Sequence, residues 1–83
     1  MPRYFFHLVN DIETQDEDGR ELTDAAAALE QARGEALAMA AVSVARHGHL
    51  LLNHRIVVTD EQGREIGIVR FGDVVSVGND EPN

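Results

Sequence analysis

Residues 54–71 read HRIVVTDEQGREIGIVRF, and this stretch decides the fold of the chain. Residues 54–59 are rich in β-branched side chains, which favour extended strands, and residues 64–71 form a second run of the same kind. Between the two runs stands the sequence from Asp60 to Gly63. Its Asp-x-x-Gly spacing is typical of a type I turn whose glycine takes a positive φ. The stretch therefore predicts a β-hairpin, and with it an antiparallel sheet.

The N-terminal residues predict two further strands. Residues 3–9, RYFFHLV, carry aromatic and β-branched side chains at alternating positions on both faces. We therefore expect a central strand, or one that is covered on both sides. Asn10 and Asp11 suit a two-residue hairpin turn. Residues 12–15 would then return as a short, polar strand near an edge of the sheet.

The segment 16–22, DEDGREL, shares five of its seven residues with DEQGREI at 60–66. We interpret both as turns in which an aspartate starts the turn and a glycine takes the left-handed conformation. A calcium loop is the alternative. An EF-hand alignment over 14–25 places a threonine at the first ligand position, and it places Ala25 where a bidentate glutamate is needed. Because both anchor positions fail, the sequence favours turn chemistry over a metal site.

Residues 25–46 predict one long helix. Thr23 or Asp24 suits the N-cap, and Gly48 is a natural C-terminal residue after the basic last turn. The order of elements is β-β-α-β-β. This order predicts an α+β fold in which a small antiparallel sheet carries one long helix packed on one face.

The domain boundaries follow from the same pattern. We expect residues 1–77 to form a single α+β domain and residues 78–83 to form a frayed polar tail. Residues 74–77 predict a further short strand or an extended arm that adds to a sheet edge. Val74, Val75 and Val77 of this arm are candidate interface residues.

The predicted helix carries apolar side chains on two sides. Leu29, Leu37 and Val44 cluster on one side of a helical wheel, whereas Met39 and Val42 do not join them. One hypothesis is that these two residues are scattered surface side chains, or that they meet the loop at 50–52. The other is that a second subunit covers them. We favour a homo-oligomer, most simply a dimer, because many apolar residues of the chain are alanines and its core is thin.

Composition excludes several classes of function. The 83-residue chain has a net charge of −8, and its seven arginines are spread along the sequence, so we expect no nucleic-acid partner. The absence of lysine and cysteine excludes Schiff-base and thiolate chemistry. No apolar run approaches the roughly 20 residues that span a bilayer, and no signal peptide is visible. We therefore expect a cytoplasmic protein with no membrane partner and no cofactor.

The remaining candidate site residues are histidines. His47, His49 and His54 lie close together in sequence around the end of the predicted helix, and three imidazoles can bind Zn²⁺ or Ni²⁺. Their spacing matches no structural zinc pattern, so we predict no metal site. His7 could act as a general base, but its position in a strand favours a packed histidine. The chain has no Gly-x-Ser-x-Gly or G-x-G-x-x-G motif, and we predict no catalytic or cofactor-binding residues.

A family resemblance extends over residues 2–71. The opening PRYFFHL, the D-E-x-G-x-E-L turn, the alanine-rich helix that begins after an aspartate, and the hairpin RIVVTDEQGREI occur in this order. Together they resemble a family of small uncharacterised bacterial proteins that is classed as a domain of unknown function. The resemblance implies a soluble cytoplasmic bacterial protein and brings no activity, ligand or catalytic residue.

Three functional hypotheses remain open. The leading one is a non-enzymatic domain that acts through protein–protein contacts, first with itself, through Met39, Val42 and the arm. The second is a regulatory module of the antitoxin type, which rests on an analogy of fold and predicts a partner toxin and a separate DNA-binding segment. The third is a domain that binds a metal or small ligand through its histidines.

Overall fold

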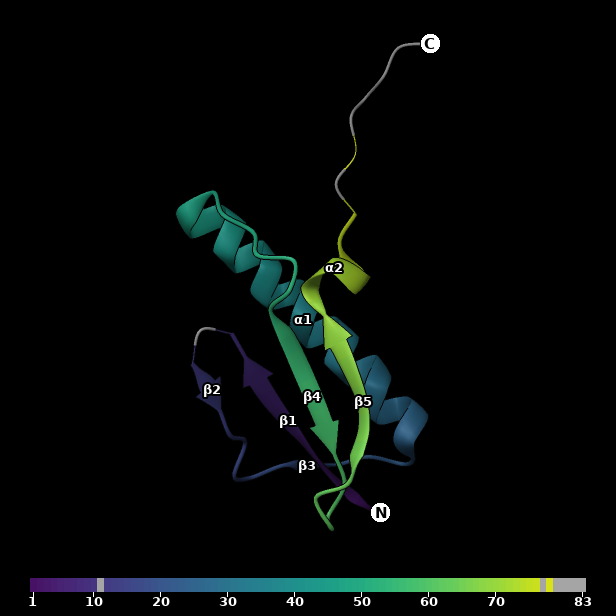
Figure 1. Cartoon of the computed structure of the whole chain (residues 1–83). Coiled ribbons are helices and arrows are strands. Elements are labelled where there is room, and N and C mark those ends of the chain that lie inside the picture. Colours follow the sequence, from purple (N-terminus) through teal and green to yellow (C-terminus); the bar gives the residue numbers. More distant parts are fainter. Residues whose placement is uncertain (11, 77, 79–83) are drawn as a thin grey trace.

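The structure is a computed structural model that describes residues 1–10, 12–76 and 78. Figure 1 shows a small sheet beside one long helix, and the mixed α+β fold is confirmed. The elements in chain order are β1 (Arg3–Val9), β2 (Glu13–Thr14), β3 (Arg20–Glu21), α1 (Ala25–His47), β4 (Arg55–Thr59), β5 (Glu65–Arg70) and α2 (Phe71–Val74).

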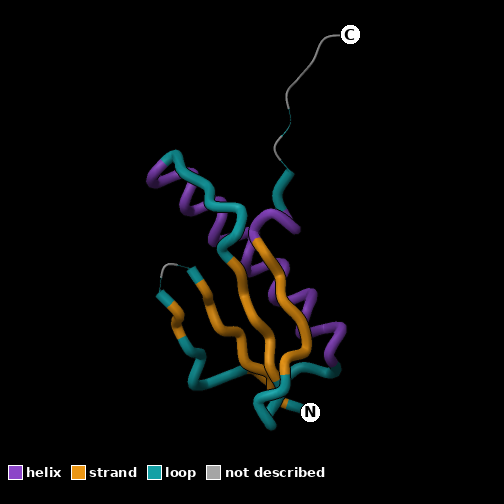
Figure 2. Tube along the Cα trace, in the orientation of Figure 1, coloured by secondary structure: helices purple, strands orange, loops and turns teal. Residues whose placement is uncertain are grey.

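The sheet is antiparallel and has the strand order β2-β1-β4-β5, with β3 also paired to β1 (Figure 2). The long strand β1 is central, as its aromatic and apolar side chains predict, because β4 pairs along one edge and β2 and β3 share the other. The polar strand β2 lies at the edge. The predicted hairpin is also present, and it carries a β-bulge at Val58 and Thr59.

Local signals place both ends of α1 correctly. The side chain of Asp24 accepts a hydrogen bond from the backbone N–H of Ala27 at 2.8 Å, which satisfies one of the free donors at the helix N-terminus. Gly48 ends the helix with φ of 60°, and its N–H donates to the carbonyl of Val44. These two residues fix the helix at the length that the sequence predicts, within one residue.

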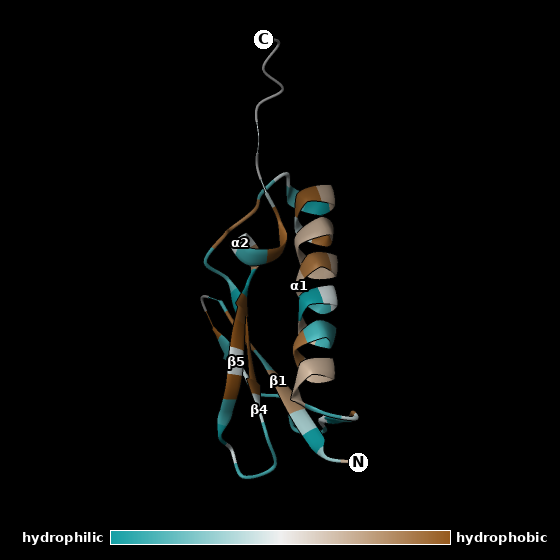
Figure 3. Cartoon of the chain, turned by 90° about the vertical axis from the view of Figure 1, so that its right-hand side faces the viewer, coloured by the Kyte–Doolittle hydropathy of each residue, from teal (hydrophilic) through white to brown (hydrophobic). Residues whose placement is uncertain are grey.

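The face of α1 that packs on the sheet is a stripe of alanines. The buried residues of the helix are Ala28, Ala32, Ala36 and Ala40, which repeat every four residues. Leu37 and Val44 lie exposed beside this stripe instead of against the sheet. Alanine has only a methyl group, so the helix comes close to the sheet and the large side chains remain at its flanks. Figure 3 shows α1 against one face of the sheet, and none of the described residues forms a helix on the other face.

The core is thin, as the composition predicts. Ile56 and Val58 on β4 are the largest fully buried side chains among the described residues. Tyr4, Val69 and Phe71 complete the buried layer between the sheet and the alanine stripe. Much of the apolar surface of this small chain therefore remains at its periphery.

The prediction of a strand or extended arm over 74–77 is wrong at its start. Phe71–Val74 forms the single-turn helix α2 directly after β5. The turn is held by side-chain and loop contacts, because Asp73 accepts a hydrogen bond from the N–H of Arg70 and Gly72 donates to the carbonyl of Leu52. Val74 and Val75 pack against the core cluster, and so they do not extend a sheet edge. Val77, and all of the predicted tail except residue 78, lie outside the described residues.

Candidate functional site

The acidic loop after β2 is organised by one carboxylate. Asp16 Oδ2 accepts a hydrogen bond from the N–H of Phe6 at 3.1 Å, and Oδ1 accepts from the N–H groups of Asp18 and Gly19 at 3.1 and 3.2 Å. Gly19 has φ of 69°, so the left-handed glycine of the predicted turn is confirmed. Asp16 therefore uses its oxygens to fasten the loop to β1, which is a structural role.

The pKa of Asp16 reflects the same contacts. Burial raises the pKa of this carboxyl, but the N–H donors of Phe6, Gly19 and Asp18 outweigh that effect, with a smaller electrostatic contribution from His7. The net result is a pKa below the ordinary value. The carboxylate is thus held in its charged form by backbone donors.

The second copy of the motif repeats this chemistry in the β4–β5 hairpin. Asp60 Oδ1 accepts hydrogen bonds from the N–H groups of Gln62 and Arg64, both at 2.9 Å, and Gly63 has φ of 78°. The N–H of Arg64 is the main reason that the pKa of Asp60 lies below its ordinary value; slight desolvation raises it, while the Gln62 N–H and the Arg64 guanidinium lower it further. Both D-E-x-G-R-E segments are therefore aspartate-led turns with a left-handed glycine.

His7 lies on the sheet face that has no helix and makes two hydrogen bonds. Its Nδ1 accepts from the N–H of Asp16 at 3.0 Å, and its Nε2 lies 3.0 Å from Thr59 Oγ1. Because Nδ1 accepts a hydrogen bond, the proton of the neutral ring belongs on Nε2, which donates it to Thr59. A general base for the Thr59 hydroxyl would need an unprotonated Nε2. This pair therefore has the wrong tautomer for nucleophilic catalysis and ties the loop to the sheet.

The open face of the sheet carries a shallow hollow of about 300 Å³ around His7. Val57 and Thr59 of β4 line it, together with Gln15 and Gly63. The ring of Phe5 stacks on His7 with centroids 6.4 Å apart. The hollow is therefore shallow and lined by both apolar and polar side chains.

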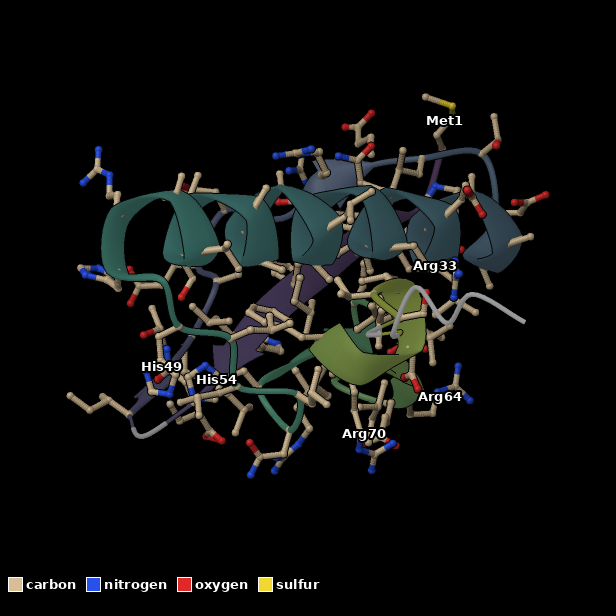
Figure 4. All side chains as sticks on the ribbon, turned by 90° about the horizontal axis from the view of Figure 1, so that it is seen from above. Met1, Arg33, His49, His54, Arg64 and Arg70 are labelled. Carbon is tan, nitrogen blue, oxygen red and sulfur yellow. The ribbon has the colours of Figure 1, made fainter. Side chains whose placement is uncertain are left out.

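The three candidate metal ligands do not converge. Within residues 1–10, 12–76 and 78, no group of three or more histidine, cysteine, aspartate or glutamate side chains is placed to hold a metal ion. The ring of His54 meets Phe71 edge-on with centroids 5.8 Å apart, and the carbonyl of His49 accepts a hydrogen bond from Ser43. Figure 4 shows His49 and His54 in the segment after α1. His47 ends α1 with its side chain exposed.

The predicted interface residues of α1 are accessible. Met39 and Val42 are both exposed, on one flank of the alanine stripe. On the other flank, exposed Leu37 and Val44 border an apolar groove of about 400 Å³. The remaining residues along this groove are Ala40, Ala41, Ala45, Leu50 and Val75. The helix thus presents apolar surface on both flanks, and Val75, which follows α2 with an extended backbone, borders the groove.

Sequence reasoning missed one feature of the open face. The register of β4 and β5 places Arg55 directly opposite Arg70. The two residues are far apart in a sequence whose arginines look evenly spread, so only strand pairing reveals that they are neighbours. Counting outward from the predicted turn does not pair these two positions either, because the β-bulge at Val58 and Thr59 shifts the register of the strands.

The fold and these surfaces define a class of protein: a small two-layer α+β domain whose candidate sites are exposed faces of its helix and sheet. Residues 3–72 match the family described as "Domain of unknown function (DUF6894)", and the chain belongs to this family. This confirms the resemblance to an uncharacterised domain family. Comparisons with curated proteins and with solved structures give no match. None of the helices in the described residues has the length and apolar character to cross a membrane.

Proposed function

We propose that this domain acts without catalysis, through contacts with other protein chains and first with a second copy of itself. The observation that carries the proposal is the apolar exposure of α1. The exposed fractions of Leu37, Met39, Val42 and Val44 are 51%, 37%, 52% and 48%. These four large apolar side chains lie within two to three turns of one helix. Together they form an exposed apolar surface that association with another chain would bury.

The charge distribution along α1 permits a second copy as the partner. The chain has a net charge of −8, so two copies repel each other over most of their surfaces. Residues 36–45, in the C-terminal half of α1, contain no charged side chain. A second copy can therefore approach along this part of the helix with the least repulsion. The thin core adds a reason, because burial between subunits stabilises each of them.

The sequence of α1 is self-complementary about its 40–41 peptide. If two copies of the helix pair antiparallel about a two-fold axis at this point, Leu37 lies opposite Val44 of the second copy. In the same arrangement Met39 lies opposite Val42 of the second copy. Each flank of the helix thus meets the matching flank of the other copy.

Small and charged residues of α1 suit the same arrangement. Between the flanks, the exposed side of the helix carries Ala38, Ala41 and Ala45, which allow two helices to approach closely. Beyond the apolar region, Glu35 would lie opposite Arg46 of the second copy. Glu35 also forms an ion pair of 3.8 Å with Arg20 of its own chain, so it already projects toward the flank of the helix.

Static light scattering tests this proposal with a matched pair of leucine variants. We expect the mass of a dimer for the wild-type chain at roughly 100 µM. Leu37→Glu should give a monomer, because it places like charges in the seam. Leu52→Glu changes another exposed leucine that lies outside α1, and it should leave the dimer intact. Circular dichroism checks that both variants fold. A wild-type monomer at this concentration would show that the proposed self-association is wrong.

A further inference from the structure

Two arginines stand side by side on the open face of the sheet. Arg55 of β4 pairs with Arg70 of β5 in the antiparallel register. The neighbouring pair, His54 and Phe71, is joined by a backbone hydrogen bond of 2.8 Å from the Phe71 N–H to the His54 carbonyl. Because the two kinds of pair alternate along the ladder, Arg55 and Arg70 form a non-hydrogen-bonded pair, in which side chains are closest. Like charges in this position destabilise a sheet.

The register places both guanidinium groups on the face opposite α1. Side chains alternate along a strand, and Ile56 and Val69, which neighbour the arginines, are buried under the helix. Figure 4 shows Arg70 projecting from the side of the sheet that lies away from α1. The arginine pair therefore belongs to the open face of the sheet.

No ion pair within the described part of the chain compensates the charge of this pair. Three other arginines, Arg3, Arg20 and Arg64, form ion pairs with Glu21, Glu35 and Asp60. Among the described residues, neither Arg55 nor Arg70 has such an ion pair. The carboxylate of Asp73 is close by, but it accepts its hydrogen bond from the backbone N–H of Arg70. Arg33 and Arg46 also have no ion pair among the described residues, but Arg55 and Arg70 are paired with each other across two strands.

The surface around the pair has room for a ligand with apolar groups. Val57 and Ile68 form the next cross-strand pair on the same face. This pair lies two residues further along the strands, about 7 Å from the arginines, and both side chains are only half-buried. Beside Arg55 lies a hollow of about 230 Å³ whose lining includes Asn10 and Asn53. The open face thus offers two cations next to an apolar row.

We propose that Arg55 and Arg70 clamp a carboxylate side chain of a peptide segment from a partner protein, with apolar residues of that segment lying on Val57 and Ile68. Two guanidinium groups supply planar, charge-assisted hydrogen bonds that match a carboxylate. The net charge of −8 opposes a long acidic run, so the ligand carries one carboxylate flanked by apolar residues. The site lies on the face opposite α1 and does not depend on association through that helix.

Nuclear magnetic resonance tests the clamp with the probe peptide acetyl-Thr-Val-Glu-Val-Thr-amide, and with the same peptide carrying glutamine in place of glutamate. The protein is full-length Leu37→Glu, so that α1 association does not affect the result. We expect saturable shifts of the Arg55 and Arg70 Nε–H signals and of the Val57 and Ile68 amides, with an affinity in the millimolar range. The glutamine peptide should bind at least tenfold more weakly.

Variants separate the clamp from general charge effects. Arg55→Gln and Arg70→Gln should each weaken binding of the glutamate peptide at least tenfold, whereas Arg33→Gln, an exposed arginine of α1, should leave it unchanged. Equal binding of the two peptides, or no saturable shift at the open face, would falsify the proposal. If raising the protein concentration alone shifts the same signals, the occupant is a second copy and a separate partner is excluded.

Discussion

Leu29 of α1 lies directly over Gly67 of β5. A Cβ atom added to Gly67 would stand 2.8 Å from the Cδ2 atom of Leu29, closer than side chains pack. The glycine therefore provides the space that the leucine fills, and the alanine stripe brings the helix close enough for this contact. The first half of α1 is positioned on the sheet by this pair together with Ala28 and Ala32.

A double-mutant cycle tests the contact between Leu29 and Gly67. Gly67→Ala should lower the free energy of unfolding by about 1 kcal/mol, because the new methyl group displaces the flexible end of the Leu29 side chain from its packed position. In a Leu29→Ala background the same substitution should cost much less. Urea unfolding of the four proteins gives the coupling energy, which we expect to be at least about 0.5 kcal/mol. Additive effects would show that the two residues do not restrict each other.

The carboxylate of Asp16 should be important for stability. Asp16→Ala removes the acceptor of three backbone N–H groups, and we expect a loss of about 1–3 kcal/mol in the free energy of unfolding, since the loop is partly open to water. Asp18→Ala is the matched control, because its side chain is exposed and should change stability by less than about 0.5 kcal/mol. Equal losses for the two variants would contradict the role assigned to Asp16.

Acid should destabilise the domain through the aspartates of its turns. The pKa values of Asp16 and Asp60 lie below the ordinary value of 3.8. A carboxyl group whose pKa is lower in the folded state stabilises the fold fully above the unfolded pKa, and this contribution is lost as pH falls through the folded pKa. Unfolding free energies measured from about pH 6 to pH 2 should therefore fall most steeply below about pH 4. Asp16→Asn should flatten that slope.

The left-handed glycines of the two aspartate turns should differ in their sensitivity to alanine. Gly63 has only its positive φ to restrict substitution, and Gly63→Ala should cost about 1–2 kcal/mol. At Gly19 an added Cβ would also lie 2.8 Å from the carbonyl oxygen of Tyr4, so Gly19→Ala should cost more. Thermal unfolding of the two variants, side by side, measures the difference. A larger loss at Gly63 would be inconsistent with the packing of the 16–19 loop on β1.

The local parts of the fold were predictable because their causes lie within a few residues. The Asp24 cap, the Gly48 terminator and both aspartate–glycine turns each satisfy backbone groups nearby in sequence. The sequence predicted an extended conformation for Val74, which is helical, because the cause of the helix lies far away in the chain. The α2 turn depends on Leu52, whose carbonyl accepts from the N–H of Gly72, and no pattern around residue 74 contains that partner.

The same distinction between local and distant causes applies to the candidate surfaces. The sequence by itself determined that α1 carries more apolar surface than one sheet can cover, because Met39 and Val42 cannot share a helix face with Leu37 and Val44. Only the tertiary structure decided that the alanines face the sheet, since the distance between two layers is set by every side chain that separates them. It also decided that Arg55 meets Arg70, because strand register joins residues that are distant along the chain.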